Sequence, residues 1–176
     1  MSEKITIRET TQSDVDFVAQ IYPRMFPEED LQPLVNSLLV LENHTLSLVA
    51  CSGSQIVAHI ILTLCGSNKH DKSAALLGPL GVLPDYQRLG IGTSLIKHAL
   101  KVMKNRSVKQ VFVLGDPDYY HRFGFAPECK IQPPYSLPEE WLSAWQAITL
   151  SQQTALEGTS LWLPEPWLKQ ELWLPE

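Results

Sequence analysis

The spacing of apolar residues divides the first half of the chain into short strands and helices. Ile5 and Ile7 alternate with polar neighbours and predict a first strand. Residues 11–26 and 27–43 predict two helical regions, the first with Ser13 as its candidate N-cap. The β-branched and apolar runs 45–51 and 55–64 are joined by a Ser-Gly-Ser turn, so they predict a β-hairpin.

The next apolar run, residues 74–83, contains residues that are unusual in a strand. Its sequence AALLGPLGVL includes two glycines and a proline, which predict a bulge or a splayed edge. From Leu89 to Lys104 the apolar positions recur at helical spacing opposite a lysine-bearing face, which predicts an amphipathic helix. Residues 109–115 predict a buried strand, and residues 116–125 a turn with a short helix.

The last 50 residues differ in composition, because they hold all five tryptophans and seven of the thirteen prolines. We expect late strands at 141–150 and 159–164 and a tail folded across the surface. The element order then indicates a mixed α/β chain around one sheet, in a single domain over residues 1–176. The pentapeptide LWLPE occurs twice in the tail. Its Trp and Leu residues suit either a homodimer contact or packing over a core edge.

Charge and cysteine content exclude several classes of protein. The 14 basic and 19 acidic side chains give a net charge of −5, which argues against binding along nucleic acid. The three cysteines have no zinc or redox spacing, so we expect free thiols in a reducing compartment and no metal. The longest apolar run is far shorter than the ~20 residues that cross a bilayer, and the start is not of signal-peptide type. We therefore expect a cytoplasmic protein without a membrane partner.

The most informative stretch is LGVLPDYQRLGIGTSLI, residues 80–96, in which two glycines open the amphipathic helix. A helix start presents unpaired N–H groups and the positive end of the helix dipole, and glycines let a phosphate approach that backbone. Arg88 can add charge-assisted hydrogen bonds. A P-loop would need Lys after Gly92, and a Rossmann fingerprint would need a small residue where Leu95 stands.

This stretch resembles the acetyl-coenzyme A binding motif of the GNAT superfamily of N-acetyltransferases. Downstream, DYYHRFGF resembles a later motif of the family, with Tyr120 four residues before Gly124-Phe125. The run VLGDPDYYHRFGFAP is similar to the YhbS-like branch of predicted N-acetyltransferases. The resemblance implies the GNAT fold: a mixed, mostly antiparallel sheet of about six to seven strands, splayed beside a bulged fourth strand and flanked by about four helices.

The resemblance also implies a site. It assigns binding of acetyl-CoA, as co-substrate, to Leu80, Gly81, Val82, Gln87, Arg88, Leu89, Gly90, Ile91, Gly92, Thr93 and Tyr120. An amine would attack the thioester directly, with the Val82 N–H polarising the thioester carbonyl and the Tyr120 hydroxyl donating a proton to the leaving thiolate. Leu114 stands where many members of the family carry a glutamate that acts as the general base. Asp116 is then the nearest acid in the sequence. Turn chemistry explains Asp116 equally well, and Asp118, Glu28, Glu29 or a water relay are the other options.

The function that follows is transfer of an acetyl group to a primary amine of a small molecule or protein. Acceptor recognition would involve residues 22–43 and the late strands. The composition of these segments does not indicate which amine is bound. Two alternatives stay open. One is a coenzyme-A-binding sensor or interaction module without turnover, and the other is a transferase that uses another acyl group.

Overall fold

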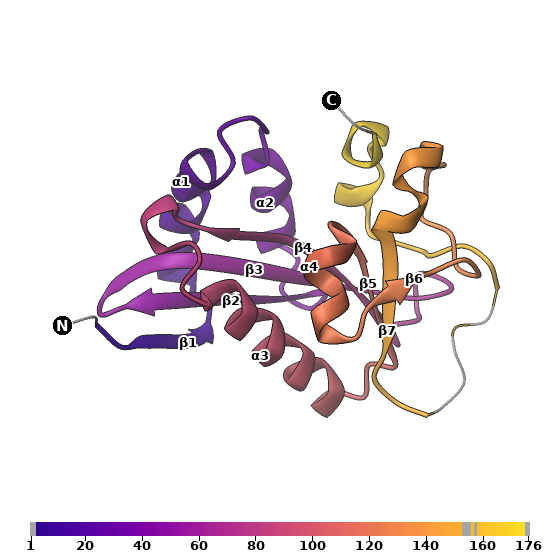
Figure 1. Cartoon of the computed structure of the whole chain (residues 1–176), viewed down its shortest axis with the longest axis horizontal. Coiled ribbons are helices and arrows are strands. Elements are labelled where there is room, and N and C mark those ends of the chain that lie inside the picture. The colour runs from indigo at the N-terminus through magenta and orange to yellow at the C-terminus, as the bar shows by residue number, and fades with distance from the viewer. Residues whose placement is uncertain (1–2, 153–155, 157, 175–176) are drawn as a thin grey trace. The chain divides into compact units, whose positions relative to one another are not determined.

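The fold is a mixed α/β arrangement with seven strands among the described residues. The structure, a computed structural model, describes residues 3–152, 156 and 158–174. The strands, in the sheet order β1-β2-β3-β4-β5-β7-β6 (Figure 1), are β1 (Ile5–Glu9), β2 (Thr45–Ser52), β3 (Gln55–Cys65), β4 (Ala74–Val82), β5 (Gln110–Leu114), β6 (Ala126–Pro127) and β7 (Trp145–Thr149). The pair β4–β5 is parallel, whereas β1–β2, β5–β7 and β6–β7 are antiparallel.

Four α-helices accompany the strands in the described part of the chain. They are α1 (Val15–Met25), α2 (Gln32–Leu39), α3 (Ile91–Asn105) and α4 (Pro117–Tyr120). Short 3₁₀ turns complete the chain: η1 (Gln12–Asp14), η2 (Pro84–Tyr86), η3 (His121–Phe123), η4 (Glu139–Ala144), η5 (Glu165–Trp167) and η6 (Gln170–Trp173). The number of strands, their mostly antiparallel pairing and the four helices confirm the predicted fold class.

The chain divides into two compact units. The first comprises Met1–Leu62 and Gly78–Lys101, and the second Thr63–Leu77 and Val102–Glu176. The boundary falls within β3, β4 and α3. The single domain expected from the chain length stays a prediction.

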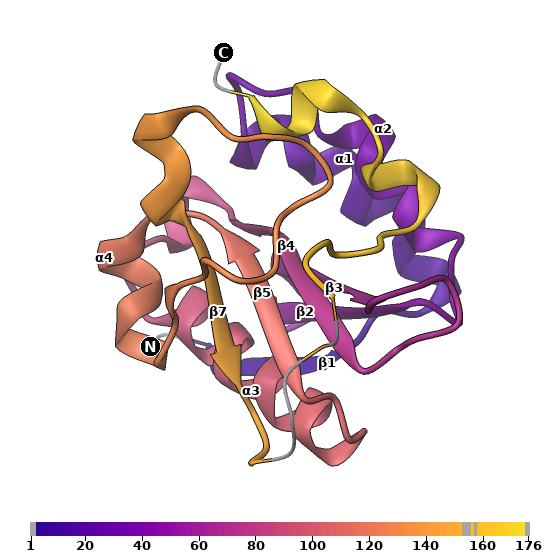
Figure 2. The same cartoon turned by 90° about the vertical axis from the view of Figure 1, so that its right-hand side faces the viewer.

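In the first unit, strands β1 to β3 carry helices on both faces. β1 pairs with β2 from Ile5↔Ser52 to Glu9↔Leu48. Figures 1 and 2 show α1 and α2 on one side of these strands and α3 on the other. Apolar side chains fill the space between strands and helices, and those at most 1 % exposed include Val18, Val35, Leu38, Leu48, Val57 and Leu95. Burial on both faces explains why β3 reads as a nearly continuous apolar run rather than an alternating one.

The start of α1 corrects the expectation that Ser13 caps the helix. Asp14 is the N-cap residue of α1, and Thr11 and Asp14 form a capping box around the preceding turn η1. The Asp14 carboxylate accepts hydrogen bonds from the Thr11 amide at 2.7 Å and from Arg8 Nη1 at 2.7 Å. The bond from Arg8 is the main reason why the pKa of Asp14 lies well below its ordinary value. These bonds hold residues 12–14 in a 3₁₀ turn, so the helix begins later, at Val15.

The last turn of α1 contains Pro23, which has no N–H to donate to the carbonyl four residues earlier. That carbonyl belongs to Ala19, and it accepts a hydrogen bond from the Gln32 side chain of α2 at 3.1 Å. The helix therefore tolerates an internal proline because the neighbouring helix supplies the missing donor.

Strand β4 changes character halfway along its length. Its parallel pairing with β5 runs from Ala74↔Gln110 to Leu77↔Val113. The next residue, Gly78, has a φ of +146° and precedes a cis peptide bond to Pro79. The remaining residues of β4, 78–82, lie beyond the register with β5. β4 thus separates from β5 after Leu77, in agreement with the splayed edge predicted from the glycines and the proline.

In the second unit, β7 pairs with β5 on one side and β6 on the other. The late strand expected at 141–150 is confined to Trp145–Thr149, and residues 139–144 form the 3₁₀ turn η4. The strand expected at 159–164 is not formed among the described residues, where only the isolated bridges Gly66↔Trp162 and Gln132↔Ser160 occur. Pro164 and Pro166 follow at once, and a proline cannot donate to a ladder.

Three tryptophans of the C-terminal region pack inside the second unit. Trp173 is 1 % exposed and contacts the rings of Trp145 and Trp167, with centroids 5.8 and 6.0 Å apart. The Trp167 Nε1–H donates to Thr63 Oγ1 of β3 at 3.0 Å, and the Trp173 Nε1–H donates to the Trp167 carbonyl at 2.9 Å. For these three residues the structure supports packing over the core.

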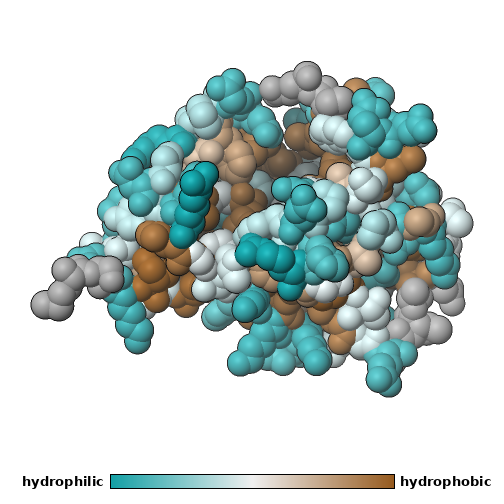
Figure 3. Space-filling model, viewed as in Figure 1, coloured by the Kyte–Doolittle hydropathy of each residue, from teal (hydrophilic) through white to brown (hydrophobic). Residues whose placement is uncertain are grey.

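The outer surface is mixed in character. On the face seen in Figure 3, hydrophilic residues predominate and hydrophobic residues are visible in separate groups. In the described part of the chain, no helix has the length and the apolar character needed to span a membrane.

Candidate functional site

The predicted phosphate-binding loop connects β4 to α3 through η2. Gly90 has a φ of +80° and Arg88 a φ of +62°. The first turn of α3 consists of Ile91, Gly92 and Thr93, and the Ser94 N–H donates to the Gly90 carbonyl at 3.0 Å. Glycine adopts a positive φ without steric cost, whereas for Arg88 this conformation is strained. The backbone thus turns sharply just before the helix begins.

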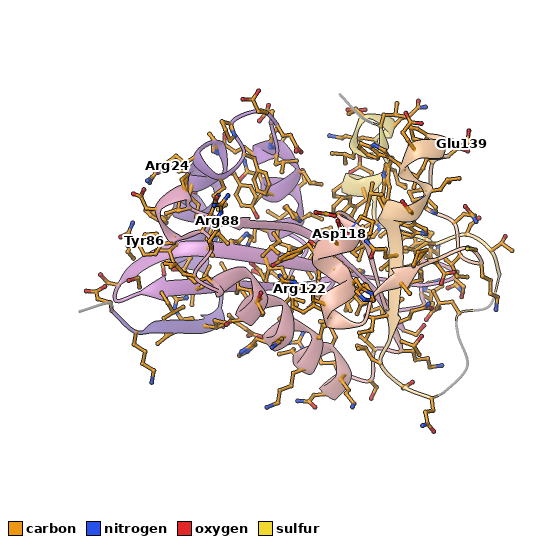
Figure 4. All side chains as sticks on the ribbon, viewed as in Figure 1. Arg24, Tyr86, Arg88, Asp118, Arg122 and Glu139 are labelled. Atoms are coloured by element: carbon orange, nitrogen blue, oxygen red, sulfur yellow. The ribbon has the colours of Figure 1, made fainter. Side chains whose placement is uncertain are left out.

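The amino end of α3 has the properties of an anion site. The first amides of a helix lack a carbonyl partner within it, and at the start of α3 they include those of residues 90–92. A Cβ built on Gly90 meets no atom within 4 Å, so the space in front of this turn is open. The side chains of Arg88 and Leu89 are exposed. Figure 4 shows Arg88 in the same region of the view as Tyr86 of η2 and Arg24 of α1.

The end of β4 presents backbone groups that the neighbouring strand β3 does not use. The Leu83 N–H donates to the Val57 carbonyl of β3 at 2.8 Å. Because successive residues of a strand direct their N–H groups to opposite edges, we expect the N–H of Val82, which precedes Leu83, to point away from β3. The Val82 carbonyl accepts a hydrogen bond from the Gln87 side chain at 3.1 Å. Gln87 therefore connects the loop to the end of the strand, a contact that the sequence did not predict.

Gly81 lies between Leu80 and Val82, and it is covered by side chains at the end of α1. A Cβ built on Gly81 would lie 2.8 Å from Met25 Sδ and Cε and 2.8 Å from Phe26 Cε2. The sequence signal for this contact was Gly81 itself, since a glycine within a strand marks the close approach of another group. We did not identify Met25 and Phe26 from the sequence.

Tyr120 lies at the end of α4, in the second unit. Its ring makes edge contacts with Tyr119 and Phe125, with centroids 5.1 and 5.6 Å away. A Cβ on Gly115 would overlap the Tyr120 ring, so Gly115 provides the space for it. Burial of the side chain, with the neighbouring Tyr119 as a second cause, raises the pKa of Tyr120 well above its ordinary value. The hydroxyl is consequently protonated at neutral pH.

Asp116 has a defined structural task. It is the N-cap residue of α4, and its Oδ1 accepts a hydrogen bond from the Asp118 amide at 3.0 Å. Both side chains are exposed. The Arg122 guanidinium lies 4.6 Å from the centre of the Tyr119 ring. The turn chemistry considered for Asp116 is therefore present, and Leu114 is paired with Trp145 in the sheet.

His59 is part of a buried network in the first unit. Its Nδ1 lies 2.6 Å from the Tyr22 hydroxyl and its Nε2 lies 2.7 Å from Ser47 Oγ, which lies 2.6 Å from Thr10 Oγ1. Burial lowers the pKa of His59 to about 3 and raises that of Tyr22. Since the buried Tyr22 hydroxyl has this partner to donate to, we assign the proton of the neutral ring to Nε2. His59 is therefore a structural residue. Separately, no group of three potential metal ligands occurs in the described residues.

The predicted site residues are distributed between the two units. All the residues from Leu80 to Thr93 that we predict to bind the coenzyme lie in the first unit, where the end of β4 and the start of α3 bring them together. Asp116 and Tyr120 lie in the second unit, on α4 and the turn before it. The first group combines the end of a strand with a helix amino terminus, and the second comprises a tyrosine whose hydroxyl is protonated and a carboxylate that caps α4.

Comparison with known proteins identifies the family of this chain. Residues 15–125 match the model of the acetyltransferase (GNAT) family. The uncharacterized N-acetyltransferase YjhQ of Escherichia coli K12 is 33 % identical over 155 residues, which cover 84 % of this chain and 86 % of that protein.

Solved structures share the fold. The GNAT family N-acetyltransferase YhbS of Escherichia coli, solved in complex with CoA, has a TM-score of 0.84 at 22 % identity and covers 96 % of this chain and 94 % of its own. An acetyltransferase of Brucella melitensis in complex with acetyl-CoA has a TM-score of 0.76 at 24 % identity, with 93 % and 98 % covered. The family match and the sequence relative establish the conclusion that the fold and motifs suggested: the chain belongs to the acetyltransferase (GNAT) family.

Proposed function

We propose that this protein transfers an acetyl group from acetyl-CoA to a primary amine, by direct attack of the amine on the thioester. The observation that carries the proposal is the turn at Gly90, where a positive φ and open space lie directly before the amides of α3. Acetyl-CoA would supply the activated acyl group, a thioester.

Binding of the coenzyme phosphates is assigned to the amino end of α3. The amides of Gly90, Ile91 and Gly92 can donate to phosphate oxygens, and the helix dipole favours negative charge there. The Arg88 guanidinium can add charge-assisted hydrogen bonds from the preceding residue, and Gln87 holds the loop against Val82. These donors fit a pyrophosphate because they are consecutive and no side chain covers them at Gly90.

Polarisation of the thioester carbonyl is assigned to the Val82 N–H. The alternation of the strand directs this N–H away from β3, and the adjoining carbonyl already has Gln87 as its partner. A fixed N–H donor stabilises the negative charge that develops on the carbonyl oxygen during acyl transfer. Loss of one such donor typically costs about 10²–10³ in kcat in other acyl-transfer enzymes.

Assistance to the departing thiolate is assigned to the Tyr120 hydroxyl. Its raised pKa keeps it protonated and therefore able to donate. A thiol with an ordinary pKa near ~8.5 is a stronger acid than this phenol. The Tyr120 hydroxyl would thus stabilise the thiolate by hydrogen bonding rather than by complete proton transfer.

Removal of a proton from the acceptor amine has two candidate routes. A lysine-like amine has a pKa of ~10.4, so presenting it as the free base at pH 7 costs about 4.6 kcal/mol. Asp116 is the nearest acid in the sequence to the position of Leu114, but its Oδ1 already caps α4. A water relay is the second route, and an acceptor of lower pKa would reduce the demand on either.

Calorimetric titration with coenzyme A and acetyl-CoA tests the binding part of the proposal. We expect micromolar binding to the wild-type protein and at least a tenfold loss in Gly90→Ala, because the added methyl group occupies the approach of the phosphate. Gly158→Ala is the matched control, since Gly158 also has a positive φ of +88° and open space around a Cβ. Absence of coenzyme binding to the wild-type protein would overturn the proposal.

A coenzyme-A sensor without turnover is the second candidate function, and Leu114 at the position of the family's glutamate favours it. Thiol release from acetyl-CoA, followed with a thiol reagent across a panel of amines, separates the two functions. A Cys129→Ser background removes the signal of the exposed Cys129 thiol. Coenzyme binding with no release above the rate without amine would identify the sensor.

The acceptor is proposed to be a primary amine of a small molecule or a protein. We place the reaction in the cytoplasm, because Cys51, Cys65 and Cys129 are all free thiols.

A further inference from the structure

The strand segment assigned to the thioester is covered on one face by Met25, the last residue of α1, and by Phe26, which follows it. Met25 is 7 % exposed, and its Sδ and Cε reach within 2.8 Å of the position a Gly81 Cβ would occupy. The ring of Phe26 approaches the same position equally closely, at its Cε2. Gly81 is itself buried. The two side chains therefore lie directly on the backbone of β4 and fill the volume that any side chain at Gly81 would need.

The Phe26 ring is held in this position from behind. It stacks on Tyr22 with ring centroids 5.8 Å apart and an angle of 17° between the planes. Tyr22 is fixed in turn by its 2.6 Å hydrogen bond to His59 and by an edge contact with the His59 ring. The Phe26 amide also donates to the Tyr22 carbonyl at 2.8 Å. Methionine adapts its shape readily, but a ring stacked on a buried, hydrogen-bonded tyrosine does not.

The face of β4 that Met25 and Phe26 cover at Gly81 adjoins the Val82 N–H, which would hold the acyl carbonyl. Gly81 and Val82 are consecutive, so their Cα atoms are ~3.8 Å apart. An acyl carbonyl bonded to the Val82 N–H would therefore lie next to the residue of β4 that Met25 and Phe26 cover. A methyl group is the smallest chain, and each further methylene requires space that these side chains fill.

We propose that Met25 and Phe26 restrict the acyl group to acetyl and exclude chains of four or more carbons. The inference rests on the proposed function, because it uses Val82 as the thioester site. It excludes a transferase for longer acyl groups, which the sequence left open. Tyr22 and His59 are positioning residues in this arrangement, since they act through Phe26.

The test is calorimetric titration of the full chain with coenzyme A, acetyl-CoA, butyryl-CoA and hexanoyl-CoA, which needs no knowledge of the acceptor. In the wild-type protein we expect butyryl-CoA to bind at least ~tenfold more weakly than acetyl-CoA, a difference of ~1.4 kcal/mol. In Phe26→Ala and Met25→Ala the ratio of the dissociation constants of butyryl-CoA and acetyl-CoA should fall below about threefold. The affinity for coenzyme A itself should be retained. Phe26→Leu, which is less disruptive to folding, should shift the ratio in the same direction.

Two further variants distinguish restriction of the acyl chain by Met25 and Phe26 from a general loss of packing in the core. Met103→Ala truncates another buried methionine, in α3, and should keep the wild-type ratio. Tyr22→Phe deletes only the hydroxyl bonded to His59 and should lower the ratio without changing the affinity for coenzyme A.

The outcomes distinguish the two proposals. If coenzyme A binds but all acyl forms bind equally, the inference is overturned and the proposed function stands. The inference is also overturned if the ratio stays at its wild-type value in both Phe26→Ala and Met25→Ala while coenzyme A still binds. If coenzyme A does not bind to the wild-type protein, the proposed function is overturned together with the inference.

Discussion

Replacing His59 by Gln is expected to remove most of the loss of folding stability that the protein undergoes between pH 7 and pH 5. In the folded protein the ring is 0 % exposed and lies between the hydroxyls of Tyr22 and Ser47. Burial lowers its pKa from 6.5 to about 3. The unfolded chain therefore binds a proton below pH 6.5 that the folded protein does not bind until near pH 3.

The sign and size of the effect follow from this difference. Unfolding takes up a proton in this range, so the free energy of unfolding is highest above pH 6.5 and falls as the pH is lowered. Between pH 7 and pH 5 the loss from His59 alone is ~2 kcal/mol. Asp14 and Asp71 have folded pKa values below the ordinary 3.8, so their contributions are lost in a more acidic range. Measurements that stop at pH 5 therefore report the contribution of His59 to the free energy of unfolding, separate from those of Asp14 and Asp71.

The assay is urea unfolding at pH 7, 6 and 5, with the free energy extrapolated to zero urea. His59→Gln should be less stable than the wild type at pH 7, because an amide cannot reach both hydroxyls, but its stability should change little with pH. The control is His98→Gln, at an exposed position of α3, which should keep the wild-type dependence. An equal loss of stability from pH 7 to pH 5 in His59→Gln and in the wild type would refute the reasoning.

Three further substitutions probe contacts described above. Tyr120→Phe should lower acetyl transfer by about a hundredfold with little change in coenzyme affinity, and unchanged turnover would remove Tyr120 from the mechanism. Gln87→Ala removes the bond to the Val82 carbonyl and should weaken acetyl-CoA binding by roughly three- to tenfold, as titration would measure. Gln32→Ala leaves the Ala19 carbonyl without its donor and should lower the free energy of unfolding by ~1 kcal/mol, whereas Gln32→Glu, which cannot donate, should do no better.

The features that the sequence predicted well depend on residues close together in the chain. The glycines at 90 and 92 indicated a helix start open to a phosphate, and Gly90 does have a positive φ and open space. The apolar runs of β2 and β3 and the interruption at Gly78 were likewise readable from local pattern. Helix starts, turns and alternation are local properties, so a short stretch of sequence determines them.

The features that the sequence did not predict depend on partners far along the chain. The start of α1 is a local exception: Ser13 was the expected cap, but Asp14 bonds to Arg8, six residues earlier, and the spacing of apolar residues does not encode this bond. The packing of Phe26 on Gly81 joins residues whose separation no periodicity encodes. The strand expected at 159–164 forms only single bridges, because prolines follow it and its bridging partner Gly66 lies in another part of the chain.

The bond from Trp167 to Thr63 has a consequence for synthesis of the protein. Its two residues are 104 positions apart, and the Trp162 amide likewise donates to the Gly66 carbonyl at 2.7 Å. The segment 63–77 therefore leaves the ribosome long before the residues that complete its packing. Since contacts of such separation form slowly, the second unit can close only after residue 167 has been synthesised. A stop codon before Trp167 would thus leave the centre of the chain exposed to aggregation and proteolysis, although every motif of the coenzyme site had been made.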